Sequence, residues 1–204
     1  MAEDIETVTK LDAAHRQIRT AIRMYFAGDD MVSIHTLACA AREIYEKHCQ
    51  SAGNDRMFNY IQASHPDLSE KELWNIINSA RNFFKHPDPD GDLNAFIQIN
   101  DASNKAMLFC ACHDCAMLCG SDQPAEVQAF NVWFMATEIP CLNNDPHQED
   151  IDAANKIQGL LSRQFPGLRE ASLEAQREMG KQLLQEVICG NLVTLPVRPK
   201  LAGN

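Results

Sequence analysis

Apolar side chains recur every three or four residues along most of this chain, and no segment shows the alternating pattern of a β-strand. Residues 4–28 are an example, because Leu11, Ile18 and Ile22 fall on one side of a helix with 3.6 residues per turn. His15 lies in the same stripe and is predicted to be a packed core histidine. A chain of 204 residues with this pattern can bury a sizeable core made of helices. We therefore predict an all-α fold.

Breaks in the apolar pattern mark the helix ends. Gly28, followed by two aspartates, can end one helix and cap the next. Ser69 and Glu72 form a capping box, and Pro87 stops the helix that begins there. The expected helices cover residues 4–28, 31–50, 57–63, 70–85, 93–119, 124–138, 148–164 and 168–190, before a loose tail at 195–204. The core side of the helix after Ser69 is predicted to comprise Leu73, Ile76, Ile77, Ala80, Phe83 and Phe84.

The predicted helices divide into an up-and-down bundle over residues 1–120 and a C-terminal helical extension over residues 121–204 that packs on it. No apolar run approaches the roughly 18 residues that cross a bilayer. The acidic first residues lack the apolar stretch of a secretory signal. Without such a signal, the eight cysteines are expected to be reduced thiols. The sequence therefore predicts a cytoplasmic protein that makes no membrane contact.

The charge of the chain bears on its partners. A formal net charge of −10 works against general nucleic-acid binding, because phosphates are neutralised by basic surfaces. Any RNA contact would have to be local. Arg16, Arg19 and Arg23 recur at i, i+3 and i+7, so they form a row on one helix. That row is either a solvated helix face or a local basic patch.

The segment Arg81-Asn-Phe-Phe-Lys-His86 lies at the end of the helix that begins after Ser69. On a helix, Asn82 and His86 lie on the same side. They share it with three further polar residues, Asn75, Asn78 and Ser79. A polar side of this kind on a helix with a good apolar face is typical of a pocket or an interface.

The pattern Arg81-Asn82-x-x-x-His86 resembles the motif of the HEPN superfamily, and the resemblance covers roughly residues 5–120. It implies a helical bundle that forms a homodimer and cleaves RNA without a metal or cofactor. His86 would then move protons at the ribose 2′-hydroxyl or the leaving oxygen, as imidazoles do near neutral pH. Arg81 would hold the scissile phosphate, and Asn82 would orient the phosphate or the histidine. Two motifs, one from each chain, could supply both the acid and the base.

Residues near the motif provide a supporting set. HEPN domains often place a polar or acidic residue of the second helix beside the motif, and Glu43 is the candidate here. His35 on the same helix and Asn78 complete the set. Segment 33–43 is also similar to one in bacterial proteins that carry an Arg-Asn-Phe-Phe-Lys-His-like stretch. Other HEPN domains are noncatalytic binding modules, so an RNA-binding role stays open beside ribonuclease activity.

Structural roles are the alternative for the motif residues. Arg81 could pair with a carboxylate, Asn82 could be a surface residue, and His86 could interact with the carbonyl end of its helix. The acidic residues Asp88, Asp90 and Asp92, which follow directly, would repel a phosphodiester unless they turn away. The second candidate function is a noncatalytic interaction protein that binds a metal or small ligand between helices.

Four cysteines lie within ten residues. On a helix, Cys112, Cys115 and Cys119 form one stripe, while Cys110 faces another way. A structural zinc site takes four ligands, usually from two chain segments, and no second CxxC is present. Buried packing, metal binding and redox activity all stay open for these thiols.

A second set of metal-ligating residues combines two histidines with the acidic loop. Two imidazoles and a carboxylate can hold zinc, iron or nickel. These would come from His35, His86, Asp88, Asp90 and Asp92. The chain has no phosphate-binding GxxxxGK[ST], no GxGxxG, no GxSxG and no HExxH. These absences argue against nucleotide hydrolysis, dinucleotide redox chemistry and serine hydrolase activity.

Overall fold

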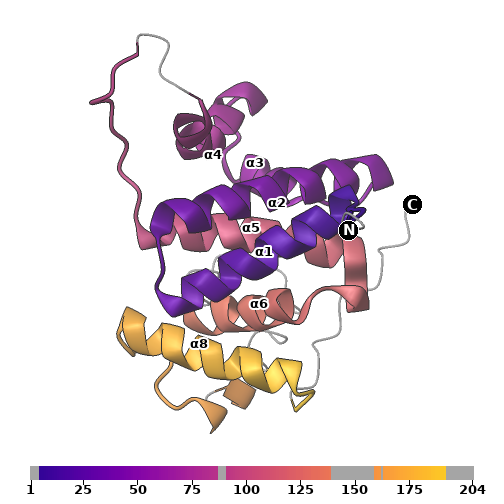
Figure 1. Ribbon diagram of the computed structural model, residues 1–204, viewed down its shortest axis with the longest axis vertical. Helices are drawn as coiled ribbons and strands as arrows, with labels where there is room; N and C mark the ends of the chain where they lie inside the picture. Colours follow the sequence, from indigo (N-terminus) through magenta and orange to yellow (C-terminus); the bar gives the residue numbers. More distant parts are fainter. Residues whose placement is uncertain (1–4, 87–90, 139–158, 162, 192–204) are drawn as a thin grey trace.

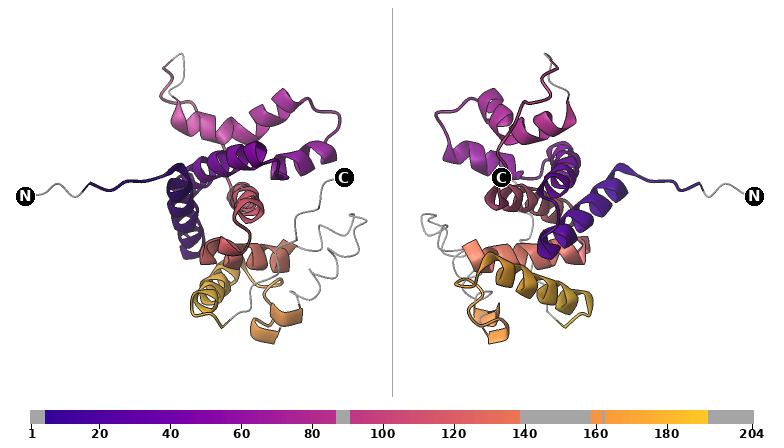
Figure 2. Two further views of the ribbon diagram at one scale, coloured as in Figure 1. Left: turned by 90° about the vertical axis from the view of Figure 1, so that its right-hand side faces the viewer. Right: turned by 60° about the vertical axis from the view of Figure 1, so that its left-hand side comes forward.

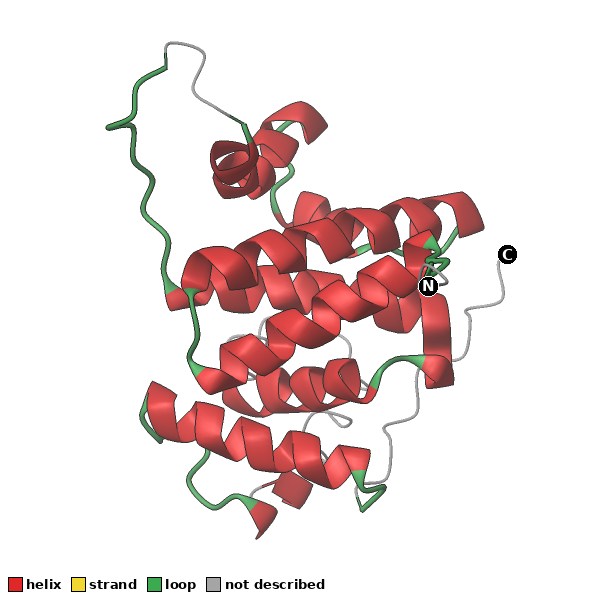
Figure 3. Cartoon of the chain, viewed as in Figure 1, coloured by secondary structure: helices red, strands yellow, loops and turns green. Residues whose placement is uncertain are grey.

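The computed structural model describes residues 5–86, 91–138, 159–161 and 163–191. In these ranges all regular structure is helical (Figure 3), so the prediction of an all-α fold is confirmed. The helices are α1 (Lys10–Ala27), α2 (Met31–Ala52), α3 (Met57–Ser64), α4 (Glu70–Lys85), α5 (Asp101–Cys119), the 3-10 turn η1 (Gly120–Asp122), α6 (Ala125–Glu138) and α8 (Leu173–Ile188).

The helices pack around one core centred on α1, α2 and α5. Helix α2 makes its most extensive contacts with α5 and α1, while α6 and α8 pack on each other and on α1. Figures 1 and 2 place α3 and α4 at one end of the molecule and α8 at the opposite end. The predicted boundary near residue 120 therefore falls between helices that share one core.

Several helix ends are fixed by side chains. The Ser69 hydroxyl accepts a hydrogen bond from the amide of Glu72, whose carboxylate accepts one from the Ser69 amide, which confirms the predicted capping box. Thr9 and Asp12 make the same reciprocal pair at the start of α1. Gly28 ends α1 with φ of 75°, a left-handed conformation that glycine adopts without a steric penalty.

Three predicted helix starts are wrong. Helix α1 begins at Lys10 instead of residue 4, and α8 begins at Leu173, where the Ser172 hydroxyl caps it. Helix α5 begins at Asp101 instead of residue 93, because the Asn100 side chain accepts a hydrogen bond from the Ser103 amide at 2.9 Å. Residues 159–161 and 163–164 are helical, but the rest of the helix predicted over 148–164 lies outside the described residues.

The orientation of α4 also differs from the prediction. Leu73 is the buried residue of this helix, while Ile76 is 59% exposed and Phe83 is 39% exposed. The inward side of α4 includes the predicted Ile77 and Phe84, together with Trp74 and Asn78, which contact Arg42 of α2. Trp74 stacks on Phe58 of α3, with ring centroids 4.6 Å apart. The predicted apolar side of α4 is therefore rotated, and part of it faces solvent.

Aromatic rings connect α1 to α6 and α8. Phe26 of α1 contacts Phe130 and Trp133 of α6, with ring centroids 6.1 and 5.5 Å apart. The Trp133 indole N–H donates to the backbone oxygen of Gln176 in α8 at 2.8 Å, so its one polar group is satisfied. Gly180 of α8 lies directly against the Phe26 ring, and no side chain fits between them.

Candidate functional site

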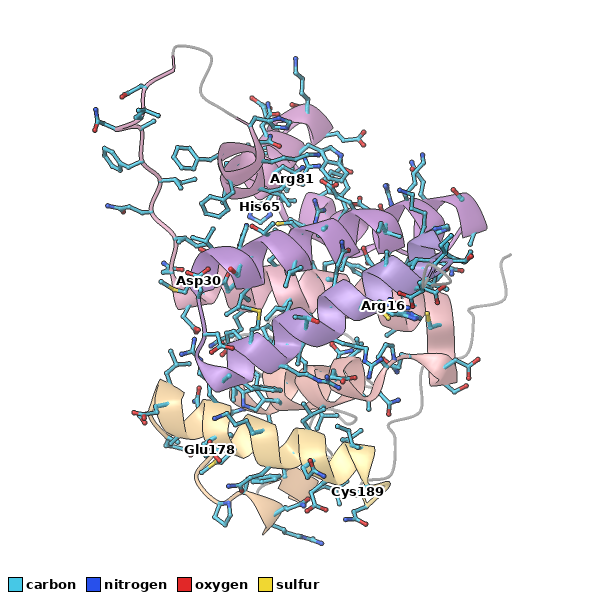
Figure 4. All side chains as sticks on the ribbon, viewed as in Figure 1. Arg16, Asp30, His65, Arg81, Glu178 and Cys189 are labelled. Atoms are coloured by element: carbon cyan, nitrogen blue, oxygen red, sulfur yellow. The ribbon has the colours of Figure 1, made fainter. Side chains whose placement is uncertain are left out.

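Arg81 of α4 is held by two polar partners. Its Nη2 atom donates to Glu43 Oε2 of α2 at 2.7 Å, and its Nη1 atom donates to Asn82 Oδ1 at 2.9 Å. The side chain is 22% exposed, so the ion pair is partly shielded from water. Figure 4 labels Arg81 beside α2. Glu43, which was expected near the motif, thus contacts it, and the guanidinium is fixed in place with further N–H groups unused by these two bonds.

His86 lies one turn beyond Asn82, at the end of the same helix. Its backbone N–H donates to the Asn82 carbonyl at 3.0 Å, and its backbone is extended, so α4 ends there. The side chain is exposed. An exposed imidazole at the end of the helix that also contains Arg81 can exchange protons with a bound molecule.

Asn78 belongs to a different contact from the one predicted for it. Its Oδ1 atom accepts a hydrogen bond from Arg42 Nη2 at 2.6 Å, and its Nδ2 atom donates to the Trp74 carbonyl. Arg42 is 3% exposed, lies over the Trp74 ring at 5.2 Å and donates to Glu46 Oε2 at 3.0 Å. This buried polar layer attaches α4 to α2 and so positions Arg81.

His35 supports the site from the interior. It is 3% exposed, and its Nδ1 atom lies 3.0 Å from Asn104 Oδ1 of α5. Its ring packs edge-on against Phe84 of α4, with centroids 5.9 Å apart. Burial lowers the pKa of His35, which favours the neutral ring. The contact with Phe84 makes His35 a packing residue behind the motif.

Glu46 is a buried carboxyl group whose pKa is raised. Burial raises its pKa from 4.5 to about 7, although Arg42 and Arg56 lie within ion-pair distance. The folded protein therefore binds this proton more tightly than the unfolded chain does. The stability that results is complete below about pH 4.5 and is lost as the pH rises through about 7.

Glu46→Gln is therefore expected to flatten the pH dependence of stability between pH 4.5 and 7. Wild type should lose at most about 1.4 kcal/mol per pH unit more than the variant over this range, because one proton is involved. Urea unfolding at a series of pH values measures this difference. Glu174→Gln, at an exposed position of α8, is the control and should keep the wild-type slope. Equal slopes for wild type and Glu46→Gln would contradict the assignment.

Two cysteines of the α5 stripe, Cys115 and Cys119, lie close to His15 of α1. Cys119 Sγ lies 3.6 Å from His15 Nε2, and Cys115 lies with them in one cluster. His15 is half-buried, so the prediction of a packed core histidine is wrong. The reason is that the end of α5 leaves His15 at the rim of the core. The sequence shows the stripe of thiols and the one histidine of α1, but it does not show that they lie close together.

The thiols of Cys115 and Cys119 have pKa values shifted in opposite directions. A hydrogen bond from Cys115 and the adjacent His15 lower the pKa of Cys119 below its usual range. The same bond and burial raise the pKa of Cys115. Cys112 is fully buried and Cys110 is half-buried, and burial raises the pKa of both thiols. Cys119 is therefore the thiol of this stripe that ionises most readily.

A hollow of about 380 Å³ adjoins the cluster, between α1, the start of α6 and the end of α8. Its lining includes His15, Arg19, Arg23, Asp122 and Glu126. Arg19 and Arg23 both pair with Glu126, which is 2% exposed, and Arg16 pairs with Glu6. Each arginine of the predicted row thus has an acidic partner, and the row is not an uncompensated basic patch.

The remaining sequence predictions concern a metal site and a membrane. Among the residues that the structure describes, the only cluster of three metal-ligating groups is His15, Cys115 and Cys119. His35 does not belong to it, and Asp88 and Asp90 lie outside the described residues. Within the described helices, none combines the length and the hydropathy needed to cross a bilayer.

Comparisons with protein families, curated proteins and solved structures found no match. No protein-family model matches the sequence, and no curated protein or solved structure shows significant similarity to the chain. The resemblance to the HEPN superfamily therefore depends on residues 81–86 and the helices around them. The structure places a fixed guanidinium and an amide at adjacent positions of α4 and an exposed imidazole at its C-cap.

Proposed function

We propose that this protein cleaves RNA as a homodimer without a metal ion, with Arg81, Asn82 and His86 at the site of cleavage. The observation that supports this most is the position of Arg81. Glu43 and Asn82 fix its guanidinium beside the turn that ends in the exposed His86. A fixed guanidinium can hold a phosphodiester with two parallel hydrogen bonds, at little entropic cost.

The reaction requires two proton transfers. A base removes the proton of the ribose 2′-hydroxyl, whose oxygen attacks the phosphorus, and an acid protonates the 5′-oxygen that leaves. The products are a 2′,3′-cyclic phosphate and a 5′-hydroxyl. One imidazole can perform one transfer, and His86 of a second chain performs the other. Arg81 stabilises the charge that develops on the phosphate oxygens.

Exposed apolar residues on α4 and in the segment before α5 support a dimer. Ile76 and Phe83 of α4 are 59% and 39% exposed. Leu93 and Phe96, in the segment between α4 and α5, are 98% and 83% exposed. A group of large apolar side chains in water favours association. A second copy of the chain is the partner that would bring two motifs together.

The test is cleavage of single-stranded and hairpin RNAs by the purified full chain with EDTA present. Arg81→Ala and His86→Ala should each lower the rate at least about 100-fold, because each removes a group that acts in the transition state. Arg16→Ala on α1 and His65→Ala in the connection between α3 and α4 are matched controls at exposed positions outside the motif, and both should retain activity.

The oligomeric state is measured on the same samples. Phe83→Asp should yield an inactive monomer, since it places a charge on the proposed interface. Ile188→Asp, at an apolar position of α8 that is 52% exposed, should leave the dimer intact. Absence of cleavage across the panel would refute the proposal, as would cleavage that survives the Arg81 and His86 substitutions.

A further inference from the structure

Three soft-metal ligands from two helices converge at the end of α5. The Nε2 or Nδ1 atom of His15 and the sulfur atoms of Cys115 and Cys119 all lie within 4.8 Å of one another. Zn–S bonds of about 2.3 Å and Zn–N bonds of about 2.0 Å place a sulfur and a nitrogen about 3.6 Å apart in a tetrahedral site. The Cys119 and His15 atoms are 3.6 Å apart. This pair therefore already has the separation that zinc requires.

We propose that His15, Cys115 and Cys119 bind one Zn²⁺ ion, with the fourth coordination position open to the hollow between α1, α6 and α8. Zinc prefers thiolate and imidazole ligands, and two thiolates with one imidazole leave the bound ion electrically neutral. The site does not depend on RNA cleavage, because its residues belong to α1 and α5 and not to α4.

The packing of the two helices provides the rigidity that a metal site needs. His15 and Cys119 are 104 residues apart in sequence, so their proximity is set by the core between α1 and α5. Cys115 is fully buried, while His15 and Cys119 are half-buried. An ion can therefore enter from the hollow and reach the buried thiol last.

The residue behind Cys115 suits a metal-bound thiolate. Tyr45 is fully buried, its ring lies 5.8 Å from the His15 ring, and its hydroxyl adjoins the Cys115 thiol. That hydroxyl has no hydrogen-bonding partner of normal geometry among the described residues. A buried donor without a partner is costly, and a thiolate at Cys115 would accept its proton as outer-shell residues of metal sites do.

The hollow offers one carboxylate to the fourth position. Asp122 lines the hollow together with His15 and is close enough for its charge to act on Cys119. The other carboxylate of the lining, Glu126, is already paired with Arg19 and Arg23. Asp122 lies outside the cluster of three ligands, and its role in the proposed site is to orient a water molecule bound to the ion.

Cobalt titration tests the site, because Co²⁺ replaces Zn²⁺ and reports its ligands by colour. The full chain, reduced and free of metal, should bind one Co²⁺ per chain, with the visible bands of tetrahedral geometry and a thiolate-to-cobalt charge-transfer band. Adding Zn²⁺ should remove both. Cys119→Ser and His15→Gln should abolish saturable binding. Cys110→Ser and Cys189→Ser, at the half-buried and the exposed thiol outside the cluster, should retain it.

Thermal unfolding provides a second measurement that does not depend on the cysteine variants. Zn²⁺ should raise the Tm of wild type, because an ion that binds only the folded state stabilises it by mass action. The Tm of His15→Gln should not change with Zn²⁺, and the variant is expected to fold because His15 is half-buried and lies outside the hydrophobic core. Cobalt bound without a thiolate band, no saturable binding, or an equal Tm rise in His15→Gln would each overturn the proposal.

Discussion

Replacing Arg42 with alanine is expected to lower the free energy of unfolding by about 3–5 kcal/mol at pH 8, the range for one partner lost from a buried ion pair. The loss leaves the carboxylate of Glu46 buried beside only Arg56, at 3.4 Å. It also removes the hydrogen bond to Asn78 and the stacking on Trp74. The pKa of about 7 holds for Glu46 beside Arg42, and without that cation the pKa rises further, so the variant either keeps an ionised carboxylate buried or binds a proton from solution at pH 8.

Urea unfolding followed by circular dichroism measures this effect. The double variant Arg42→Ala/Glu46→Gln should recover part of the loss, because the buried charge is no longer present. Arg16→Ala, which removes an exposed ion pair with Glu6, is the matched control and should leave the midpoint unchanged. A loss below about 1 kcal/mol for Arg42→Ala would mean that water reaches Glu46 and solvates it.

Replacing Gly180 with leucine is expected to cost about 3–5 kcal/mol, similar to the deletion of a buried aromatic side chain. A Cβ atom at this position would lie 2.3 Å from a carbon of the Phe26 ring. That ring cannot simply move aside, since it is 1% exposed and packs against Trp133. Either the ring leaves the core or α8 moves away from α1, and both expose apolar surface.

Replacement of Gly180 by alanine tests the same contact with a single added methyl group. Gly180→Ala should also destabilise, by about 1–3 kcal/mol, although alanine is favoured over glycine in a helix by about 1 kcal/mol. Gln182→Leu, at an exposed position of α8, is the control and should leave stability nearly unchanged. Stabilisation by Gly180→Ala in thermal unfolding would show that α8 is free to move relative to Phe26.

Local signals in the sequence predict the helices where a side chain defines an end. Ser69 and Gly28 are such residues, and their helices begin or end as expected. Leu93 and Phe96 are spaced like one face of a helix, yet both are exposed and the helix begins only after Asn100. Periodicity reports spacing alone, and it does not distinguish a short apolar segment from the first turn of a helix.

Contacts between helices limit what the sequence predicts about the site. The resemblance placed Glu43 near Arg81, and the two side chains are in contact. Helical spacing placed Asn78 on the same side of the helix as the motif, but Asn78 accepts a hydrogen bond from Arg42 in the contact with α2. His15 and Cys119 meet only because α1 packs against α5, and no local pattern indicates which helices are neighbours.

The packing of α1 against α8 has a consequence for how the chain folds as it is synthesised. Phe26 belongs to the first helix, and the surface that covers it includes Gly180, more than 150 residues later. Domains that depend on such distant contacts complete their core late. Until α8 leaves the ribosome, the aromatic side chains of α1 and α6 are not covered by that helix. The nascent chain therefore exposes an apolar surface that is prone to aggregation.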